Sequence, residues 1–208
     1  MAEKSQLNGA KIPISLQLDG RQIDGAVVKP LSFQSFADCI VAAQAMKQPQ
    51  SFEARIRRLR LHRQVTYYTN GSAAPVSIEE VLRLSIPDVR TLIARLDDHE
   101  GVAGKIIRDG DGIDKAITYE LGTPISMGQG KEPIRELEFH ASTYGDIEDV
   151  LAADNPIQQT AELIVRIAKP LGSTLLVLPS TALNSVTVAD GVMISREILP
   201  RFLGSPDE

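Results

Sequence analysis

The residues that could bind a metal ion or act as a nucleophile are few and scattered. The chain has one cysteine, Cys39, and three histidines, His62, His99 and His140. A structural zinc site needs four nitrogen or sulfur ligands at short, regular spacings, which these residues do not provide. We therefore predict no metal site. A single cysteine also excludes a disulfide bond within the chain.

Two glycine-rich or acidic segments match known ligand-binding motifs only in part. Gly101–Lys105 lacks the spacing and the hydroxyl residue of a phosphate-binding loop. Asp109–Glu120 has the length of a calcium-binding loop, but Ile113 stands where an oxygen ligand is needed and Asp114 replaces the required glycine. We therefore predict that the protein is not an enzyme and holds no cofactor.

Positive charge is concentrated in one segment of nine residues, with arginines at Arg55, Arg57, Arg58, Arg60 and Arg63. Such a cluster could bind RNA or an acidic helix of a partner protein. The alternative is a solvated helix face beside an apolar stripe. The net charge of −5 and an aromatic content of 4% disfavour a nucleic-acid binder. As a binding site, we expect Arg55, Arg57 and Arg58 to contact an acidic protein.

The apolar pattern of the first half predicts a β-hairpin followed by helices. Ile12–Leu18 alternates apolar and polar residues as a half-buried strand does, and Pro13 indicates an edge strand because proline cannot donate to the ladder. Asp19-Gly20 is a turn signal before a second strand at Ile23–Val28. Helices are predicted at Phe33–Met46 after the N-cap Ser32, at Phe52–Val65, from Ser77 towards Ile86, and from Ser85 through Leu96, with a loop at 67–75.

The second half repeats this order of elements. A segment with four glycines, 98–116, is expected to be a linker or exposed loop. Strands are predicted at Ile117–Met127 and Ile134–Phe139, joined by a turn at Gly128–Lys131. Helices are predicted from Ser142, at Ile157–Ala168 and within Val186–Leu203, where Pro200 should kink or end the helix.

Two ordered matches indicate that the chain contains an internal duplication. Gln22–Phe33 aligns with Pro133–Tyr144 at a shift of 111, and Leu84–Asp88 aligns with Val186–Asp190 at a shift of 102. We predict an α+β protein of two related units, each a β-hairpin or small antiparallel sheet followed by packed α-helices. The predicted units span 1–97 and 117–208, with 98–116 as the linker.

The two halves carry opposite net charge. Residues 11–97 hold 12 basic and 8 acidic groups, and residues 117–208 hold 6 basic and 13 acidic groups. Opposite charges could favour contact between the halves or self-association of copies. The alternative is that each half simply tolerates its own surface charges.

The N-terminus and the apolar runs suggest no export or membrane insertion. The first eleven residues are polar and lack the apolar core of a signal peptide. No run approaches the ~18 apolar residues of a membrane span, and the apolar stretch Ser173–Pro179 is short. A lone thiol suits a reducing cytoplasm.

The second half carries a pattern that can be compared with a known family. A hairpin with Lys131-Glu132 in its turn leads into the strand Ile134–Phe139 and the helix start Ser142–Asp146. The chain closes with Leu183–Gly191 and an apolar stretch to Phe202. This pattern resembles that of the Mu-like phage tail assembly chaperones. The first half is similar more weakly, through Lys29–Phe33 and Leu84–Asp88, and the chain departs from the family in having two copies of the unit and an arginine-rich helix.

The resemblance implies a non-enzymatic protein in the cytoplasm of a bacterial host, encoded by a phage or prophage. It would bind the tape-measure protein and keep it soluble until the tail-tube protein polymerises around it, without contact to nucleic acid or membrane. Partner contacts at helical spacing would come from Ile194, Ile198, Leu199 and Phe202, although the pattern favours an ordinary core for each of them. The alternative is a structural tail or baseplate subunit located in the virion tail, which duplication and charge asymmetry would suit. A third hypothesis, an enzyme or nucleic-acid binder, is favoured only by the arginine cluster.

Overall fold

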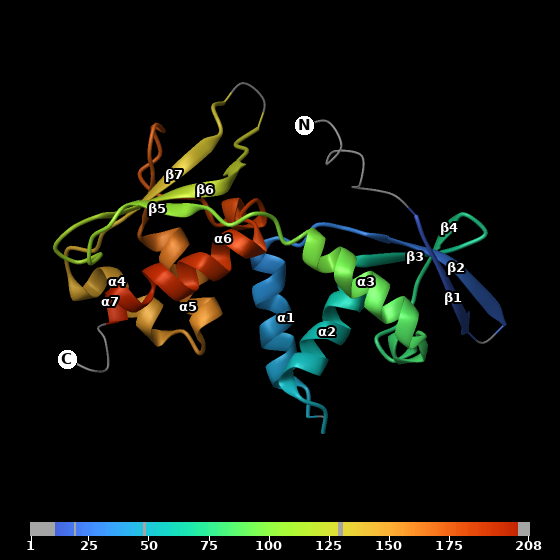
Figure 1. The fold of residues 1–208 in the computed structure, drawn as a ribbon. Helices are drawn as coiled ribbons and strands as arrows, with labels where there is room; N and C mark the ends of the chain where they lie inside the picture. The colour runs from blue at the N-terminus through green and yellow to red at the C-terminus, as the bar shows by residue number, and fades with distance from the viewer. Residues whose placement is uncertain (1–10, 19, 48, 129–130, 204–208) are drawn as a thin grey trace. The chain divides into compact units, whose positions relative to one another are not determined.

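The computed structural model of the chain describes residues 11–18, 20–47, 49–128 and 131–203 (Figure 1). The chain divides into two compact units. The first takes the chain up to Leu31 together with Asp38–Glu100, and the second takes Ser32–Ala37 together with the chain from Gly101 on. Each unit contains a four-stranded antiparallel sheet and several helices. The predicted α+β class is therefore confirmed.

The first unit is built on a sheet with the strand order β1-β2-β3-β4. Because β1 lies at the edge of this sheet, the position predicted from Pro13 is confirmed. The elements in chain order are β1 (Ile12–Leu18), β2 (Arg21–Val28), α1 (Phe33–Ala45), α2 (Phe52–Arg63), β3 (Val65–Thr69), β4 (Ser72–Ala74), the 3₁₀ helix η1 (Glu80–Arg83) and α3 (Ile86–Asp98).

The core of the first unit lies between one face of this sheet and α3. Alternate residues of the strands, such as Leu16 and Ile23, are buried against Leu92 and Leu96 of α3. The helix begins where the sequence predicts, because the Ser85 hydroxyl accepts the Asp88 N–H at 3.2 Å. Each of these buried side chains contributes about 1.5–3 kcal/mol relative to an exposed position.

The segment predicted as a loop at 67–75 is instead a hairpin, so that prediction is wrong. Strands β3 and β4 pair with each other across Asn70-Gly71. Both central residues adopt positive φ values, 49° and 81°. Asn-Gly tolerates this conformation at little cost, and the resulting turn matches the twist of paired strands.

The second unit is built on a sheet with the strand order β5-β6-β7-β8. Figure 1 shows α4, α5, α6 and α7 on one side of this sheet. The elements are β5 (Lys105–Arg108), β6 (Ile117–Ile125), β7 (Ile134–Phe139), α4 (Tyr144–Ala152), α5 (Pro156–Arg166), β8 (Ala168–Pro170), the 3₁₀ helix η2 (Ser180–Asn184), α6 (Val188–Met193), the π-helical turn η3 (Ile194–Ile198) and α7 (Pro200–Leu203).

The boundaries predicted for the units, 1–97 and 117–208 with a linker at 98–116, need correction. Lys105–Arg108 form the edge strand β5, which pairs with β6. Glycine makes this pairing possible, since a Cβ on Gly104 would lie 1.8 Å from the Glu120 carbonyl oxygen. The second unit also includes Ser32–Ala37, because the Phe33 ring packs on Gly191 and its N–H bonds the Val186 carbonyl at 2.9 Å.

The two predicted sequence matches fall at equivalent structural positions. At the shift of 111, Ala26 of β2 corresponds to Leu137 of β7, and the helix starts Phe33 and Tyr144 coincide. At the shift of 102, the N-cap Ser85 corresponds to the N-cap Thr187. By their order in the sheets, β1, β2 and β3 correspond to β6, β7 and β8. The first sheet has the additional strand β4 next to β3, and the second sheet has the additional strand β5 next to β6.

The predicted turns at Asp19-Gly20 and Gly128–Lys131 are described only in part. Asp19 and Gln129–Gly130 of the predicted turns lie outside the described residues, while Gly20 has a φ of 77° that glycine tolerates. Within the described ranges, none of the helices has the length and apolar character needed to cross a membrane.

Candidate protein-binding surface

The four residues predicted as helical partner contacts lie in the core of the second unit. Ile194 and Ile198 are 0% exposed, Leu199 is 2% exposed and Phe202 is 3% exposed. They pack with the sheet and with α5 in one apolar cluster. The prediction of a contact surface here is therefore wrong, and the core alternative describes the structure.

A π-helical turn explains how all four side chains become buried. The Leu199 N–H bonds the Ile194 carbonyl at 2.9 Å, five residues back, and a new helical turn begins at Pro200. The turn lies directly before the proline, which cannot donate the hydrogen bond that a continuous helix would require. The predicted kink or end at Pro200 thus takes the form of a widened turn.

The three arginines predicted as partner contacts do not form one basic face. Arg57 is exposed, whereas Arg58 is buried. Arg55 is half-buried, donates to the Met46 carbonyl and lies over the Phe52 ring at 5.8 Å from its centroid. Of the predicted set, only Arg57 is freely presented to a partner, so the predicted arginine contact is corrected to one residue.

Arg60 of the same cluster has a structural role. It is 9% exposed, donates to the Gln64 side chain at 3.0 Å, and pairs with Glu100 at 2.9 Å. Burial of a guanidinium requires such partners, because an unpaired buried charge is costly. The alternative prediction of a solvated helix face is therefore also wrong for Arg58 and Arg60.

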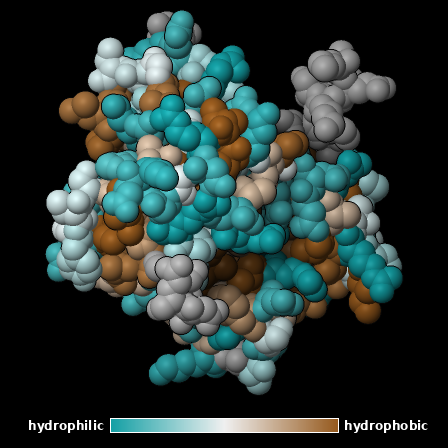
Figure 2. All heavy atoms as spheres, turned by 60° about the vertical axis from the view of Figure 1, so that its left-hand side comes forward, coloured by the Kyte–Doolittle hydropathy of each residue, from teal (hydrophilic) through white to brown (hydrophobic). Residues whose placement is uncertain are grey.

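A hollow on the second unit combines exposed apolar side chains with charged ones. Among the residues that the structure describes, the most exposed large apolar one is Leu176, 80% exposed, and the neighbouring Val177 is 50% exposed. Both line the hollow together with Arg166 at the end of α5 and Lys169 in β8. Figure 2 shows apolar side chains of this kind reaching the surface between hydrophilic ones. Apolar anchors with a charged rim are typical of surfaces that bind other polypeptides.

The N-terminus of α4 fixes the acidic side of this hollow. Asp146 accepts the Thr143 N–H at 2.7 Å and the Ser142 N–H at 2.9 Å. The Thr143 N–H, followed by the Ser142 N–H, lowers the pKa of Asp146 below its ordinary value, and the nearby His140 adds to the effect. The carboxylate is thereby held in its charged form at the rim.

Arg166 forms the basic side of the hollow and is held by two carboxylates. Its guanidinium lies 2.6 Å from Asp149 in α4 and 2.7 Å from Glu162 one turn earlier in α5. The hydrogen bond to Glu162 raises the pKa of Arg166. These pairs connect the two helices and keep the arginine beside Leu176 and Val177.

The first unit has a hollow at the equivalent place. It is lined by Thr66 of β3, which corresponds to Lys169 of β8, and by the neighbouring Val65, whose counterpart Ala168 does not line the hollow of the second unit. Ala73 and Ala74 of β4 also line it. They follow the first residue of β3 at the same distance in sequence at which Leu176 and Val177 follow the first residue of β8. The first unit thus has a hollow beside β3 and the second has one beside β8, and of these two hollows the one beside β8 is lined by exposed large apolar side chains, Leu176 and Val177.

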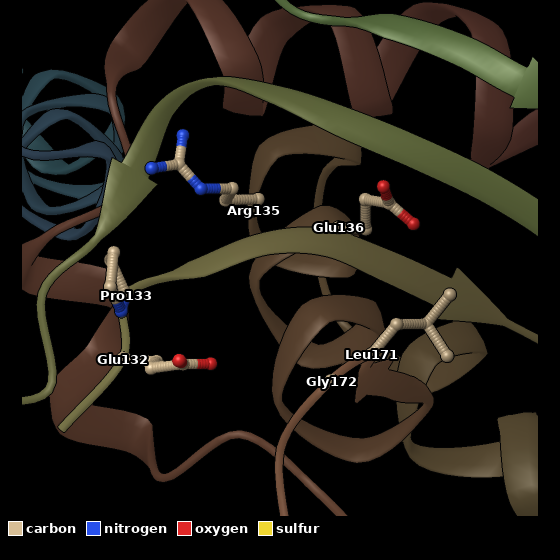
Figure 3. A pocket seen from close by; sticks show the side chains of 6 residues that line it. All are labelled: Glu132, Pro133, Arg135, Glu136, Leu171 and Gly172. Carbon is tan, nitrogen blue, oxygen red and sulfur yellow. The ribbon is translucent and has the colours of Figure 1, made fainter.

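A second hollow on the second unit has a different lining (Figure 3). Arg135 and Glu136 project from neighbouring positions of β7, and Leu171 follows β8. Glu132 and Pro133 complete its wall. Charged groups prevail here over apolar ones, so this hollow is the weaker candidate for an apolar partner.

The sequence contained a signal for the Leu176 surface. Leu175–Leu178 is an apolar run between Gly172 and Pro179 that is far too short to span a membrane. An apolar run that is too short for a membrane and bounded by turn residues can mark an exposed binding loop.

Comparisons with known proteins give no assignment of the chain. No model of a known protein family, no curated protein and no solved structure matches it. Among residues 11–18, 20–47, 49–128 and 131–203, no group of three or more histidine, cysteine, aspartate or glutamate side chains is arranged to hold a metal ion.

Proposed function

We propose that the protein is a non-enzymatic tail assembly chaperone of a phage or prophage, which acts in the host cytoplasm, binds the tape-measure protein and assists tail-tube assembly. The observation that carries the proposal is the hollow beside β8, where Leu176 and Val177 are exposed next to Arg166. A long, amphipathic partner offers the apolar and acidic side chains that such a surface binds.

The duplicated architecture supports the same role. Two equivalent hollows on one chain can engage two segments of a long partner, and the second contact then forms at high effective concentration. Weak individual contacts therefore suffice for a complex that must later release its partner to the tail-tube protein.

The test is co-expression with the tape-measure protein of the same phage, followed by gel filtration at micromolar concentration. The unchanged chain should elute with its partner, and the double variant Leu176→Ser, Val177→Ser should elute alone. Leu82→Ser is the matched control, because Leu82 is an exposed leucine of the first unit at 61% exposure. Separate elution of the unchanged chain and the tape-measure protein would contradict the proposal.

A structural tail or baseplate subunit is the second candidate function. It is favoured by the duplication and by the opposite charges of the two halves, which suit packing between copies. Mass spectrometry of purified virions separates the two candidates, since a chaperone should be absent from mature particles and a structural subunit should be present.

A further inference from the structure

The two units differ at one edge of their sheets. In the second unit, β5 covers the outer edge of β6, whereas β1, the equivalent of β6 in the first unit, has no described strand on that side. The equivalence follows from the pairing, because Ile12 lies opposite Ala26 and Tyr119 lies opposite Leu137. The first unit therefore leaves open a position that the second unit fills with a strand.

Strand β5 makes two kinds of contact at this position in the second unit. Ile106, which lies opposite Tyr119, packs against the core. The residue that follows the strand, Asp109, is bound by the Arg201 guanidinium, which also donates to the Gly110 carbonyl at 2.9 Å. An apolar side chain and a carboxylate directly after the strand thus hold β5 in place.

The first unit has a hollow at the position that corresponds to β5. Its walls are Ile12 and Pro13 of β1 and the preceding Lys11, together with Arg95 of α3 and its C-cap residue His99. Ile12 and Tyr119 lie opposite equivalent residues, so β1 and β6 align at a shift of 107. Residues 11–13 then correspond to residues 118–120, and these are the residues that pair with β5. At the shift of 102, His99 corresponds to Arg201.

The described lining of this hollow is basic and apolar. Arg95 and His99 contribute nitrogen donors, while Ile12, Pro13 and Val28 contribute apolar surface. The Lys11 ammonium is already paired with Asp24 at 2.8 Å, and the lining itself contains no carboxylate. Arg95 is 43% exposed and its ion pair with Asp98 is long, 3.6 Å, so its donors remain accessible to a further anion. The chemistry matches the pair of contacts that holds β5 in the second unit.

We propose that this hollow binds an extended segment of a partner polypeptide that lies antiparallel to β1. The segment places an apolar side chain where Ile106 lies in the second unit, and its following acidic residue binds Arg95 and His99. Strand addition of this kind obtains affinity from the backbone and specificity from the side chains. The proposal concerns a site separate from the Leu176 surface and does not depend on the proposed function.

The β5 segment of a second copy fits the hollow poorly. Lys105 and Arg108 pair with Glu120 and Glu138 in the second unit. In the first unit, Pro13 stands in the place of Glu120 and Val27 in the place of Glu138. Lys105 and Arg108 of a second copy would therefore find no carboxylate there. Pro13 lacks an N–H and Ser15 donates to Asp88 at 3.4 Å, which confines the pairing to the beginning of β1.

The probe is a fluorescent synthetic peptide of sequence Thr-Val-Thr-Ile-Thr-Asp-Asp, titrated with the full chain and followed by anisotropy. We expect binding that weakens about tenfold when both aspartates of the peptide are replaced by asparagine, since hydrogen bonds to a charged carboxylate are stronger than those to a neutral amide. The variant Arg95→Gln, His99→Gln should show a similar loss. Arg90→Gln, an exposed change on the same helix, is the matched control and should bind as the unchanged chain does.

Three results would overturn the proposal. The first is no binding up to about 1 mM peptide, the upper range of a weak specific contact. The second is binding that the Arg95→Gln, His99→Gln variant leaves unchanged. The third is binding that occurs only after removal of residues 1–10, which would assign the hollow to the chain's own N-terminal segment. A peptide with proline in place of its central isoleucine should bind more weakly, because the backbone N–H is lost.

Discussion

Asp88 and Asp190 occupy the same position in the two units but have different partners. Each exchanges hydrogen bonds with the hydroxyl of its N-cap residue, Ser85 at 2.8 Å and Thr187 at 2.9 Å. Asp190 is fully buried, and its second oxygen accepts three further donors. These are the N–H groups of Gly104 at 2.8 Å and Gly122 at 2.9 Å and the Tyr119 hydroxyl at 2.9 Å. One carboxylate therefore joins α6, β6 and the residue before β5.

Replacement of this carboxylate should destabilise the second unit strongly. In Asp190→Ala, a buried hydroxyl and two part-buried N–H groups lose their acceptor, so we expect a loss of about 3 kcal/mol in the free energy of unfolding. The matched change Asp88→Ala removes a helix cap and one long hydrogen bond from the Ser15 N–H at 3.4 Å, and should cost about 1 kcal/mol. Urea denaturation followed by circular dichroism measures both losses. Equal losses in the two variants would show that the additional donors contribute nothing.

The close backbone approach at β5 gives a second prediction. A Cβ on Gly122 would lie 1.8 Å from the Val102 carbonyl oxygen, and backbone atoms cannot move aside as a flexible side chain can. Gly122→Ala should therefore lower the free energy of unfolding by about 2 kcal/mol or more. Gly145→Ala is the control, because its Cβ would meet only Thr143 at 3.7 Å and alanine favours the helix by about 0.5–1 kcal/mol. Thermal melts should move in opposite directions for the two variants.

The parts of the fold that could be predicted from the sequence are those fixed by local signals. The caps Ser32 and Ser85 and the edge position of Pro13 each depend on neighbouring residues alone. The β3–β4 hairpin also has a local signal in the sequence, because Asn70-Gly71 is typical of a two-residue hairpin turn.

Strand β5 and the binding surface could not be predicted in the same way. Lys105–Arg108 is short and charged at both ends, and it becomes a strand only because Gly104 allows close approach to β6. Helical spacing places Ile198 on the apolar face of a helix. The same spacing is compatible with burial in the core and with contact to a partner protein. Leu176 lies in a loop without periodicity, so its exposure follows from tertiary packing alone.

The contrast between Ile198 and Leu176 can be measured directly. Ile198 is 0% exposed within the core of the second unit, so Ile198→Ala should cost about 2–5 kcal/mol in the free energy of unfolding. Leu176 is 80% exposed, and Leu176→Ala should change that free energy by no more than about 0.5 kcal/mol. Chemical denaturation of the two variants provides the measurement. A large loss for Leu176→Ala would mean that this side chain serves the fold rather than a partner.

The single thiol reports on local opening of the first unit. Cys39 is fully buried with Ala43 and Leu59, and burial raises the pKa of its thiol. A buried, protonated thiol reacts only when the structure opens, so labelling by a disulfide reagent at pH 8 should be about a hundredfold slower than in denaturant. Leu59→Ala should accelerate the reaction by loosening this cluster. Labelling of the native chain at the rate of a free thiol would contradict the buried position of Cys39.

The capping carboxylate of α4 predicts a pH dependence with a defined sign. The N–H groups of Thr143 and Ser142 lower the pKa of Asp146 in the folded chain, while in the unfolded chain an aspartate titrates near about 3.9. The charged Asp146 carboxylate therefore stabilises the folded chain fully above about pH 5, and this stabilisation is lost as the pH falls through the lowered pKa of Asp146. Asp146→Asn removes this titration, so its melting temperature should lie below that of the unchanged chain at pH 7, and the difference should shrink below pH 4. Asp154→Asn, an exposed change of the same charge, is the control. A difference between Asp146→Asn and the unchanged chain that stays constant from pH 7 to pH 3 would show that these N–H groups do not favour the charged carboxylate.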